Sequence, residues 1–161
     1  MNTILEQKIG FDKIRTLLKS RCVSPIGEEE VEKMKFSTDY FFISQRLDET
    51  NEMTRLLMEE EAFPLGNIYD LREGLFRIKI EGLYLDAGEL FDLQRSLLTI
   101  ATIVSFLEKK SEIEYPALKL MVAEVLTFKD VTDRIGLILD KFGKIKDNAS
   151  STGVAVVRGL G

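Results

Sequence analysis

The chain has 161 residues, of which 45% are hydrophobic and 30% charged, the balance of a soluble globular domain rather than a disordered segment. Its formal net charge of −5 argues against a surface that binds nucleic acid or anionic lipid over its whole extent, because such surfaces are basic. Histidine is absent and there is no glycine-rich phosphate-binding motif, so Ser–His or Cys–His catalysis and histidine metal sites are excluded and catalysis within these residues is not expected.

The first two predicted helices follow from apolar residues at helical spacing. One begins at an N-cap at Asp12 and carries an apolar stripe formed by Ile14, Leu17, Leu18 and Cys22. The next begins at Ser24 and Pro25, where serine caps the helix and proline takes the first turn, in which its missing N–H is not needed.

A third and longer helix is predicted from Ser37 or Thr38 to about Glu60. Three aromatic residues crowd its start: Tyr40, Phe41 and Phe42. Aromatic side chains interleaved with cations can stack on nucleic-acid bases. No lysine or arginine lies within three residues of these aromatics, so we expect them to pack in the core.

Residues 63–67, FPLGN, interrupt the helical pattern, because Pro64 cannot continue a helix and Gly66 permits a turn. Asn67 is then predicted to cap a short helix that ends at Gly82.

The strongest local signal is LDAGE, residues 85–89, in which Asp86 and Glu89 have the spacing of a capping box. The helix that follows has apolar residues at alternating spacings of three and four, a seam formed by Leu90, Leu93, Leu97, Ile100, Val104 and Leu107. Such a seam needs a partner helix. We favour a partner within the same chain, with a homodimer as the alternative.

Two further helices are predicted, one starting at Tyr115 and Pro116 and one spanning about Lys129 to Lys141, closed by Gly143. Apart from a possible short strand in GKIKD, residues 143–147, no strand pattern is found. The prediction is therefore an all-α fold, an irregular bundle of about six or seven helices.

Charged residues offer two kinds of candidate site. Paired carboxylates such as Asp48 and Glu52 could bind Mg²⁺, but amphipathic helices place them on polar faces, so no catalytic or metal-binding residue is expected. Three lysines around the last predicted turn could bind a phosphate backbone: Lys141, Lys144 and Lys146. The alternative, which we favour, is that these lysines neutralise the C-terminal dipole of the preceding helix.

Location is indicated by what the chain lacks. Cys22 is the one cysteine, so an intrachain disulfide is excluded and a cytoplasmic protein is expected. The opening residues do not have the pattern of a signal peptide. The longest uncharged run, Ser96 to Leu107, is shorter than the ~20 residues of a membrane span, so no membrane association is expected.

Four segments resemble, in order and spacing, the N-terminal region of the second bacterial MutS paralogue, the form with a C-terminal Smr endonuclease domain. They are FDKI (residues 11–14), SPIG (24–27), PLGNIYDLR (64–72) and FGKIKDNAS (142–150). The resemblance covers about residues 3–150. It implies a helical core that leads into long lever helices, within a longer protein that also carries an ATPase.

The resemblance implies a non-catalytic part of a DNA-binding protein of the mismatch-repair family, concerned with DNA repair and recombination control. The implied partners are branched or double-stranded DNA and, in some bacteria, the ribosome. ATP and Mg²⁺ would belong to the parent protein, because its ATP and nuclease motifs match no position here. The alternative is a helical module for protein–protein interaction or dimerisation.

The end of the chain departs from the family pattern. Where the lever helix should begin, Gly153 is followed by Val154, Ala155, Val156 and Val157, and glycine and valine are poor helix formers. We therefore expect a helical MutS core-like domain in residues 1–150 and a truncated lever start in residues 151–161.

Overall fold

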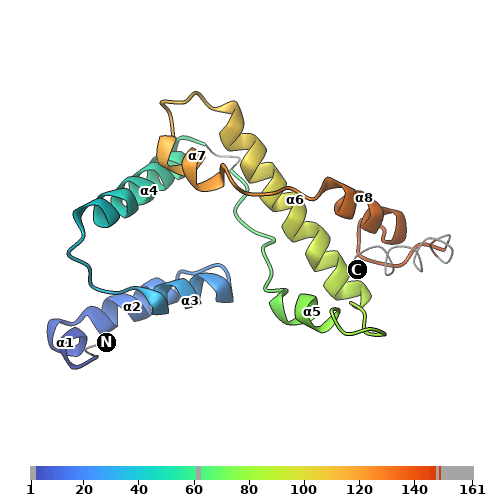
Figure 1. Ribbon diagram of the computed structural model, residues 1–161, viewed down its shortest axis with the longest axis horizontal. Coiled ribbons are helices and arrows are strands. Elements are labelled where there is room, and N and C mark those ends of the chain that lie inside the picture. The colour runs from blue at the N-terminus through green and yellow to red at the C-terminus, as the bar shows by residue number, and fades with distance from the viewer. Residues whose placement is uncertain (1–2, 61–62, 148, 150–161) are drawn as a thin grey trace. The chain divides into compact units, whose positions relative to one another are not determined.

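The computed structural model describes residues 3–60, 63–147 and 149 (Figure 1). Within these residues the fold is all-α, as predicted, and contains no strand. It has eight helices rather than six or seven: α1 (Thr3–Ile9), α2 (Phe11–Lys19), α3 (Pro25–Lys33), α4 (Tyr40–Glu59), α5 (Arg72–Arg77), α6 (Ala87–Lys109), α7 (Pro116–Val122) and α8 (Lys129–Ile138). The atypical tail expected in residues 151–161 lies outside the described residues.

The chain divides into two compact units, Met1–Arg46 and Leu47–Gly161. The first contains α1, α2 and α3, and the second contains α5 to α8 and most of α4. Neither α2 nor α3 has a buried residue. Polar contacts therefore carry much of the organisation of the first unit.

Arg15 on α2 ties the three helices of the first unit together. Its Nη2 donates to Oε1 of Glu6 on α1 at 2.9 Å and to the carbonyl oxygen of Met34 at 3.2 Å. Its Nη1 donates to the carbonyl oxygen of Val31, in the last turn of α3. Because a guanidinium carries several donors in one plane, this one side chain reaches a carboxylate on α1 and two carbonyl groups at the end of α3.

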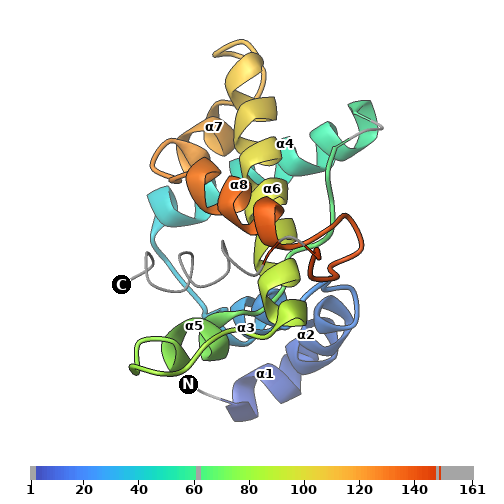
Figure 2. The same ribbon diagram turned by 90° about the vertical axis from the view of Figure 1, so that its right-hand side faces the viewer.

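Helix α6 organises the second unit, and α7 and α8 lie beside it in both Figure 1 and Figure 2. One hydrophobic cluster joins α6 to α8 and the segment that follows α8; its buried members are Leu93, Ile135, Ile138, Leu139 and Ala149. A second cluster joins α6 to α4 and α7; its buried members are Leu56, Leu107, Tyr115 and Leu118. Burial of these side chains stabilises the unit by the removal of apolar surface from water.

The predicted seam on α6 is used inside the chain. Leu93 belongs to the first cluster, Leu97 packs against it, and Leu107 belongs to the second cluster. These seam residues therefore have partner helices within the chain, which is the interpretation that the spacing favoured.

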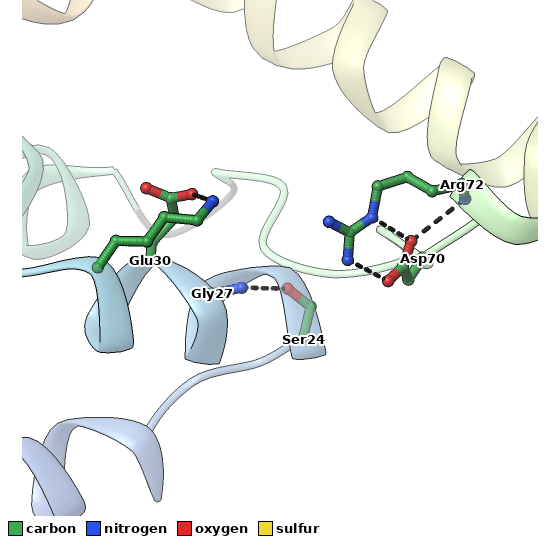
Figure 3. A network of polar contacts seen from close by, with 6 residues as sticks. Ser24, Gly27, Glu30, Asp70 and Arg72 are labelled. Atoms are coloured by element: carbon green, nitrogen blue, oxygen red, sulfur yellow. Dashed lines mark hydrogen bonds and ion pairs between the residues drawn. The ribbon is translucent and has the colours of Figure 1, made fainter.

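Three predicted helix starts are confirmed. Ser24 caps α3, with its Oγ accepting a hydrogen bond from the Gly27 N–H at 3.3 Å (Figure 3). Asp86 and Glu89 form the capping box of α6. Helix α7 begins at Pro116, directly after Tyr115.

Other boundaries differ from the predictions, and α1 was not predicted. Helix α2 begins after Gly10, whose φ of 76° lies in the left-handed region, and not at a cap on Asp12. Asn67 does not cap a helix, because it is itself left-handed at φ 55° and α5 begins only at Arg72. Helix α8 ends at Ile138 rather than Lys141, since Leu139 turns to extended backbone.

The aromatic residues at the start of α4 are exposed, so the prediction that they pack in the core is wrong. The exposed fraction is 75% for Tyr40, 83% for Phe41 and 47% for Phe42. Phe36, just before the helix, is 90% exposed. Residues 36–42 of the first unit thus present a row of large apolar side chains to solvent.

Helix α6 is long and apolar enough, by length and composition, to cross a membrane: it has 23 residues and its most apolar stretch has a mean hydropathy of 1.4, with 22% of that stretch buried. One such helix is weak evidence for a membrane span, because the core helices of soluble proteins share these properties. Here α6 carries both hydrophobic clusters of its unit. The expectation of no membrane association stays a prediction.

Candidate nucleic-acid interface

The three candidate lysines lie on a tight turn that follows α8, residues 140–146. Asp140 builds this turn, because its Oδ1 accepts hydrogen bonds from the backbone N–H groups of Phe142 and Lys144, each at 2.9 Å. The Asp140 N–H donates to the Lys144 carbonyl at 2.8 Å, and Leu139 pairs with Ile145 in an isolated antiparallel bridge. The short strand suspected in GKIKD is therefore one bridge of a turn.

Gly143 is required at the tip of this turn for two reasons. Its φ of 79° lies in the left-handed region that favours glycine. A Cβ at this position would also lie 2.8 Å from the ring of Phe91, which is closer than carbon atoms approach without displacement. The turn is thus held against α6 as well as by its own hydrogen bonds.

The lysines of the turn have different surroundings. Lys146 is partly buried, and its Nζ donates to the carbonyl oxygen of Gly136 in the last turn of α8. Lys141 is exposed, with its Nζ 5.0 Å from the centre of the Phe142 ring. Lys144 is exposed, and no acidic side chain pairs with it among the described residues. The structure therefore places Lys146 at the end of the helix dipole, as the favoured alternative expected, and leaves Lys141 and Lys144 at the surface.

One oxygen of the Asp140 carboxylate, Oδ1, is used inside the turn. The hydrogen bonds from the N–H groups of Lys144 and Phe142 hold the pKa of this carboxyl below its usual range, and the ammonium groups of Lys144 and Lys146 act in the same direction. Asp140 thus remains ionised while its oxygen serves the backbone.

The segment PLGNIYDLR packs on the same half of α6 as the basic turn. The N–H of Tyr69 donates to Oγ of Ser96 at 3.0 Å. The Arg95 guanidinium donates to Oδ1 of Asn67 and lies 5.1 Å from the centre of the Tyr69 ring and 5.3 Å from that of Phe91. Because Phe91 also contacts Gly143, two segments far apart in the sequence meet through one aromatic ring.

Asp70 and Arg72 close the same segment. Arg72 donates from Nε to Asp70 Oδ1 at 2.8 Å and from Nη2 to Oδ2 at 2.5 Å, as Figure 3 shows. These bonds lower the pKa of Asp70 to about 2. This pair fixes the backbone just before α5.

The prediction that Glu52, one of the paired carboxylates, lies on a polar helix face is wrong. It is buried at 8% exposure, and its carboxylate accepts hydrogen bonds from the start of α7. In the part of the chain that the structure describes, no group of three or more His, Cys, Asp or Glu residues could hold a metal ion.

Sequence reasoning missed two residues at this site, Phe142 and Arg95. Phe142 directly follows the predicted last helix, whose apolar spacing favours an inward-facing side chain, but it is 71% exposed because the helix ends four residues earlier. Arg95 has no local motif, and its role depends on Asn67 and Tyr69, which are brought to it by the fold. In the sequence, the available signal for the turn was a glycine, Gly143, between Lys141 and Lys144.

Comparison with known proteins gives one consistent relationship. The chain is 30% identical over 151 residues to an "Endonuclease MutS2" from Alkaliphilus oremlandii, covering 93% of this chain and 19% of that protein. It is 30% identical over 142 residues to the "Endonuclease MutS2" of Symbiobacterium thermophilum, covering 88% and 18%, respectively. The protein of the same name from Alkaliphilus metalliredigens is 28% identical over 153 residues.

The chain spans about a fifth of the length of these relatives. No protein-family model and no solved structure matches it. The resemblance to the second bacterial MutS paralogue that the four segments predicted is confirmed.

Proposed function

We propose that the chain acts as a non-catalytic helical core element of a MutS-like DNA-binding protein. It is similar to a segment that makes up about a fifth of the length of each endonuclease MutS2 relative. The observation that carries this proposal is the similarity along 88% to 94% of the chain. The two hydrophobic clusters support this proposal. They pack other helices against α6, as expected of a scaffold that holds other regions of a longer protein in place.

In this proposal the chemistry resides elsewhere in the longer protein. ATP with Mg²⁺ and the nuclease reaction belong to regions outside these residues, and DNA repair with control of recombination is the process served. Branched or double-stranded DNA is the proposed partner, with the ribosome as a further one, in the cytoplasm. This chain contributes a stable helical scaffold to the longer protein, together with the basic turn of residues 140–146.

A chimera tests the scaffold role. The matching segment of the Symbiobacterium thermophilum relative is replaced by this chain, and DNA binding and cleavage are compared with those of the parent and of a parent lacking the segment. We expect the chimera to retain both activities and the deletion to lose them. A chimera that folds, by circular dichroism and thermal melting, but binds no DNA contradicts the proposal.

The chain by itself should bind double-stranded DNA weakly, because its net charge is −5. The apparent affinity should fall steeply as salt increases, since phosphate contacts release counterions. Tight binding that is insensitive to salt would contradict this expectation.

A second candidate, a protein–protein contact module, is favoured by the exposed residues Phe36, Tyr40 and Phe41. Contiguous exposed apolar side chains mark contact surfaces in soluble proteins. Sedimentation velocity of the chain and of a Phe41→Ser variant tests it: association that the variant abolishes supports a contact surface, and a monomer at all concentrations opposes self-association. Leu97→Asp serves as the contrast, because an intrachain seam makes that variant unfold rather than dissociate.

A further inference from the structure

The turn after α8 holds an aromatic side chain in solvent on a rigid backbone. Phe142 is 71% exposed, yet the backbone on both sides is fixed. Its own N–H and that of Lys144 bond to the Asp140 carboxylate, and the Gly143 N–H donates to the Asp140 carbonyl at 3.0 Å. A ring presented in this way loses little conformational entropy when it binds a partner.

Cations flank this ring on both sides in the sequence. Lys141 places its Nζ 5.0 Å from the ring centre, and Lys144 follows two residues after Phe142, both exposed. Oδ1 of Asp140, in the same turn, accepts hydrogen bonds from the backbone N–H groups of Phe142 and Lys144, and no ion pair joins Asp140 to Lys141 or Lys144 among the described residues. Asp147 is exposed and follows Lys146 in the sequence, and the ammonium of Lys146 binds the end of α8.

An exposed aromatic ring between cations matches the chemistry of an unpaired nucleotide. The base of a single strand stacks on an aromatic ring, and the phosphates on either side of it contact the cations. In a duplex the base faces are hidden by stacking within the helix, so the ring would add nothing to double-stranded DNA binding. Ile145, the residue after Lys144, is 65% exposed and adds apolar surface to the same turn.

We propose that the turn of residues 140–146 binds a single-stranded nucleic-acid segment, with an unpaired base on Phe142 and adjacent phosphates on Lys141 and Lys144. The proposal rests on the proposed function and deepens it, since branched DNA includes flaps and forks, which carry single-stranded segments. Lys146 is not a phosphate contact, because its ammonium stabilises the end of α8.

The test is fluorescence anisotropy with the whole chain, a labelled oligothymidylate of about twelve nucleotides and a duplex of equal length. We expect the single strand to bind more tightly than the duplex. Phe142→Leu keeps an apolar side chain but removes the ring, and we expect about tenfold weaker single-strand binding. Phe142→Tyr keeps the ring and should restore the affinity of the unchanged chain.

Lys141→Gln and Lys144→Gln test the phosphate contacts separately from the ring. Each should lower the slope of log affinity against log salt by about 0.7 for a single strand. Phe142→Leu should leave this slope unchanged. Lys146→Gln should alter thermal stability more than it alters the slope, because its ammonium serves α8.

Phe76 provides a matched control in the same unit. It is 69% exposed and has Lys79 Nζ 5.5 Å from its ring centre. Phe76→Leu should leave single-strand binding unchanged. The proposal is overturned if Phe76→Leu and Phe142→Leu weaken binding equally, if the duplex binds as well as the single strand, or if Phe142→Leu changes only the sedimentation of the chain, which would indicate a protein contact.

Failure of this proposal is distinguishable from failure of the scaffold role. A chimera that binds and cleaves DNA while Phe142→Leu has no effect on the oligothymidylate sinks the single-strand site alone. Loss of activity in a folded chimera sinks the scaffold role, whatever the oligonucleotide result.

Discussion

The carboxylate of Glu52 on α4 caps the start of α7, with Oε2 accepting a hydrogen bond from the Leu118 N–H at 2.9 Å. Oε1 accepts another from the Ala117 N–H at 3.1 Å. Helix α7 has no side-chain cap of its own, since Tyr115 occupies its N-cap position and Pro116 its first turn. A remote carboxylate thus does what a serine or aspartate at the N-cap does in other helices.

Glu52→Ala should destabilise the second unit by about 2 kcal/mol, because two helix N–H groups lose a charged acceptor in a buried place. Glu52→Gln keeps one acceptor oxygen and should cost about half as much. Urea unfolding followed by circular dichroism measures both. Glu112→Gln is the control: its side chain is 88% exposed in its ion pair with Lys119, so a loss equal to that of Glu52→Gln would contradict the capping role.

Arg15→Met should loosen α1, α2 and α3, because it removes the donors that hold Glu6 and the carbonyl groups at the end of α3. We expect a loss of about 2 kcal/mol in the first unit. Hydrogen exchange read by peptide shows where protection falls, with Lys19→Gln, from an exposed ion pair, as the control. Equal loss of protection in α6 and α8 would mean that the two units unfold together, contrary to this prediction.

Gly143→Ala should destabilise the turn through both its backbone and its contact with Phe91. The left-handed conformation alone costs about 1 kcal/mol for alanine. Gly82→Ala isolates that part, because Gly82 has φ 87° and open space where the Cβ would lie. Thermal melting should show a larger loss at 143 than at 82, and Phe91→Ala in the same molecule should remove the difference; equal losses at the two glycines would argue against the contact.

The Asp70 carboxyl should titrate about two pH units below an ordinary aspartate, since its pKa is about 2. A depressed pKa in the folded state means that the contribution of this group to stability is full above the ordinary value and is lost as pH falls toward 2. Carbon-13 NMR of the side-chain carboxyl measures the midpoint. Arg72→Gln should raise it toward its usual range, and an unchanged midpoint would show that Arg72 is not the cause.

Local signals predicted some helix starts correctly, but they missed the starts of α2 and α5 and the end of α8. The correctly predicted starts depend on contacts within three residues, so the sequence alone indicates them; they lie at Ser24, Asp86 and Pro116. The end of α8 depends instead on the pairing of Leu139 with Ile145 and on the fit of Gly143 against Phe91. The first of these contacts is made within the turn itself and the second by α6, and helical spacing alone contains neither of them.

Burial was predicted less reliably than helix content. Phe41 is apolar and yet 83% exposed, while Glu52 is charged and buried at 8%. An apolar residue is buried only where another element covers it, and a carboxylate only where donors meet it. The same limit applies to the candidate site: the lysines were found by composition, but which of them stays free is decided by the carbonyl group of Gly136.

The bond between Glu52 and Leu118 closes a loop of 66 residues. During translation, α4 is complete well before α7 is made. The Glu52 carboxylate therefore stays hydrated until the N–H groups of Ala117 and Leu118 become available. Helix α7, at seven residues, is too short to persist by itself in water. A chain halted before Leu118 therefore holds α4 and α6 without the hydrogen bonds by which Glu52 joins α4 to α7.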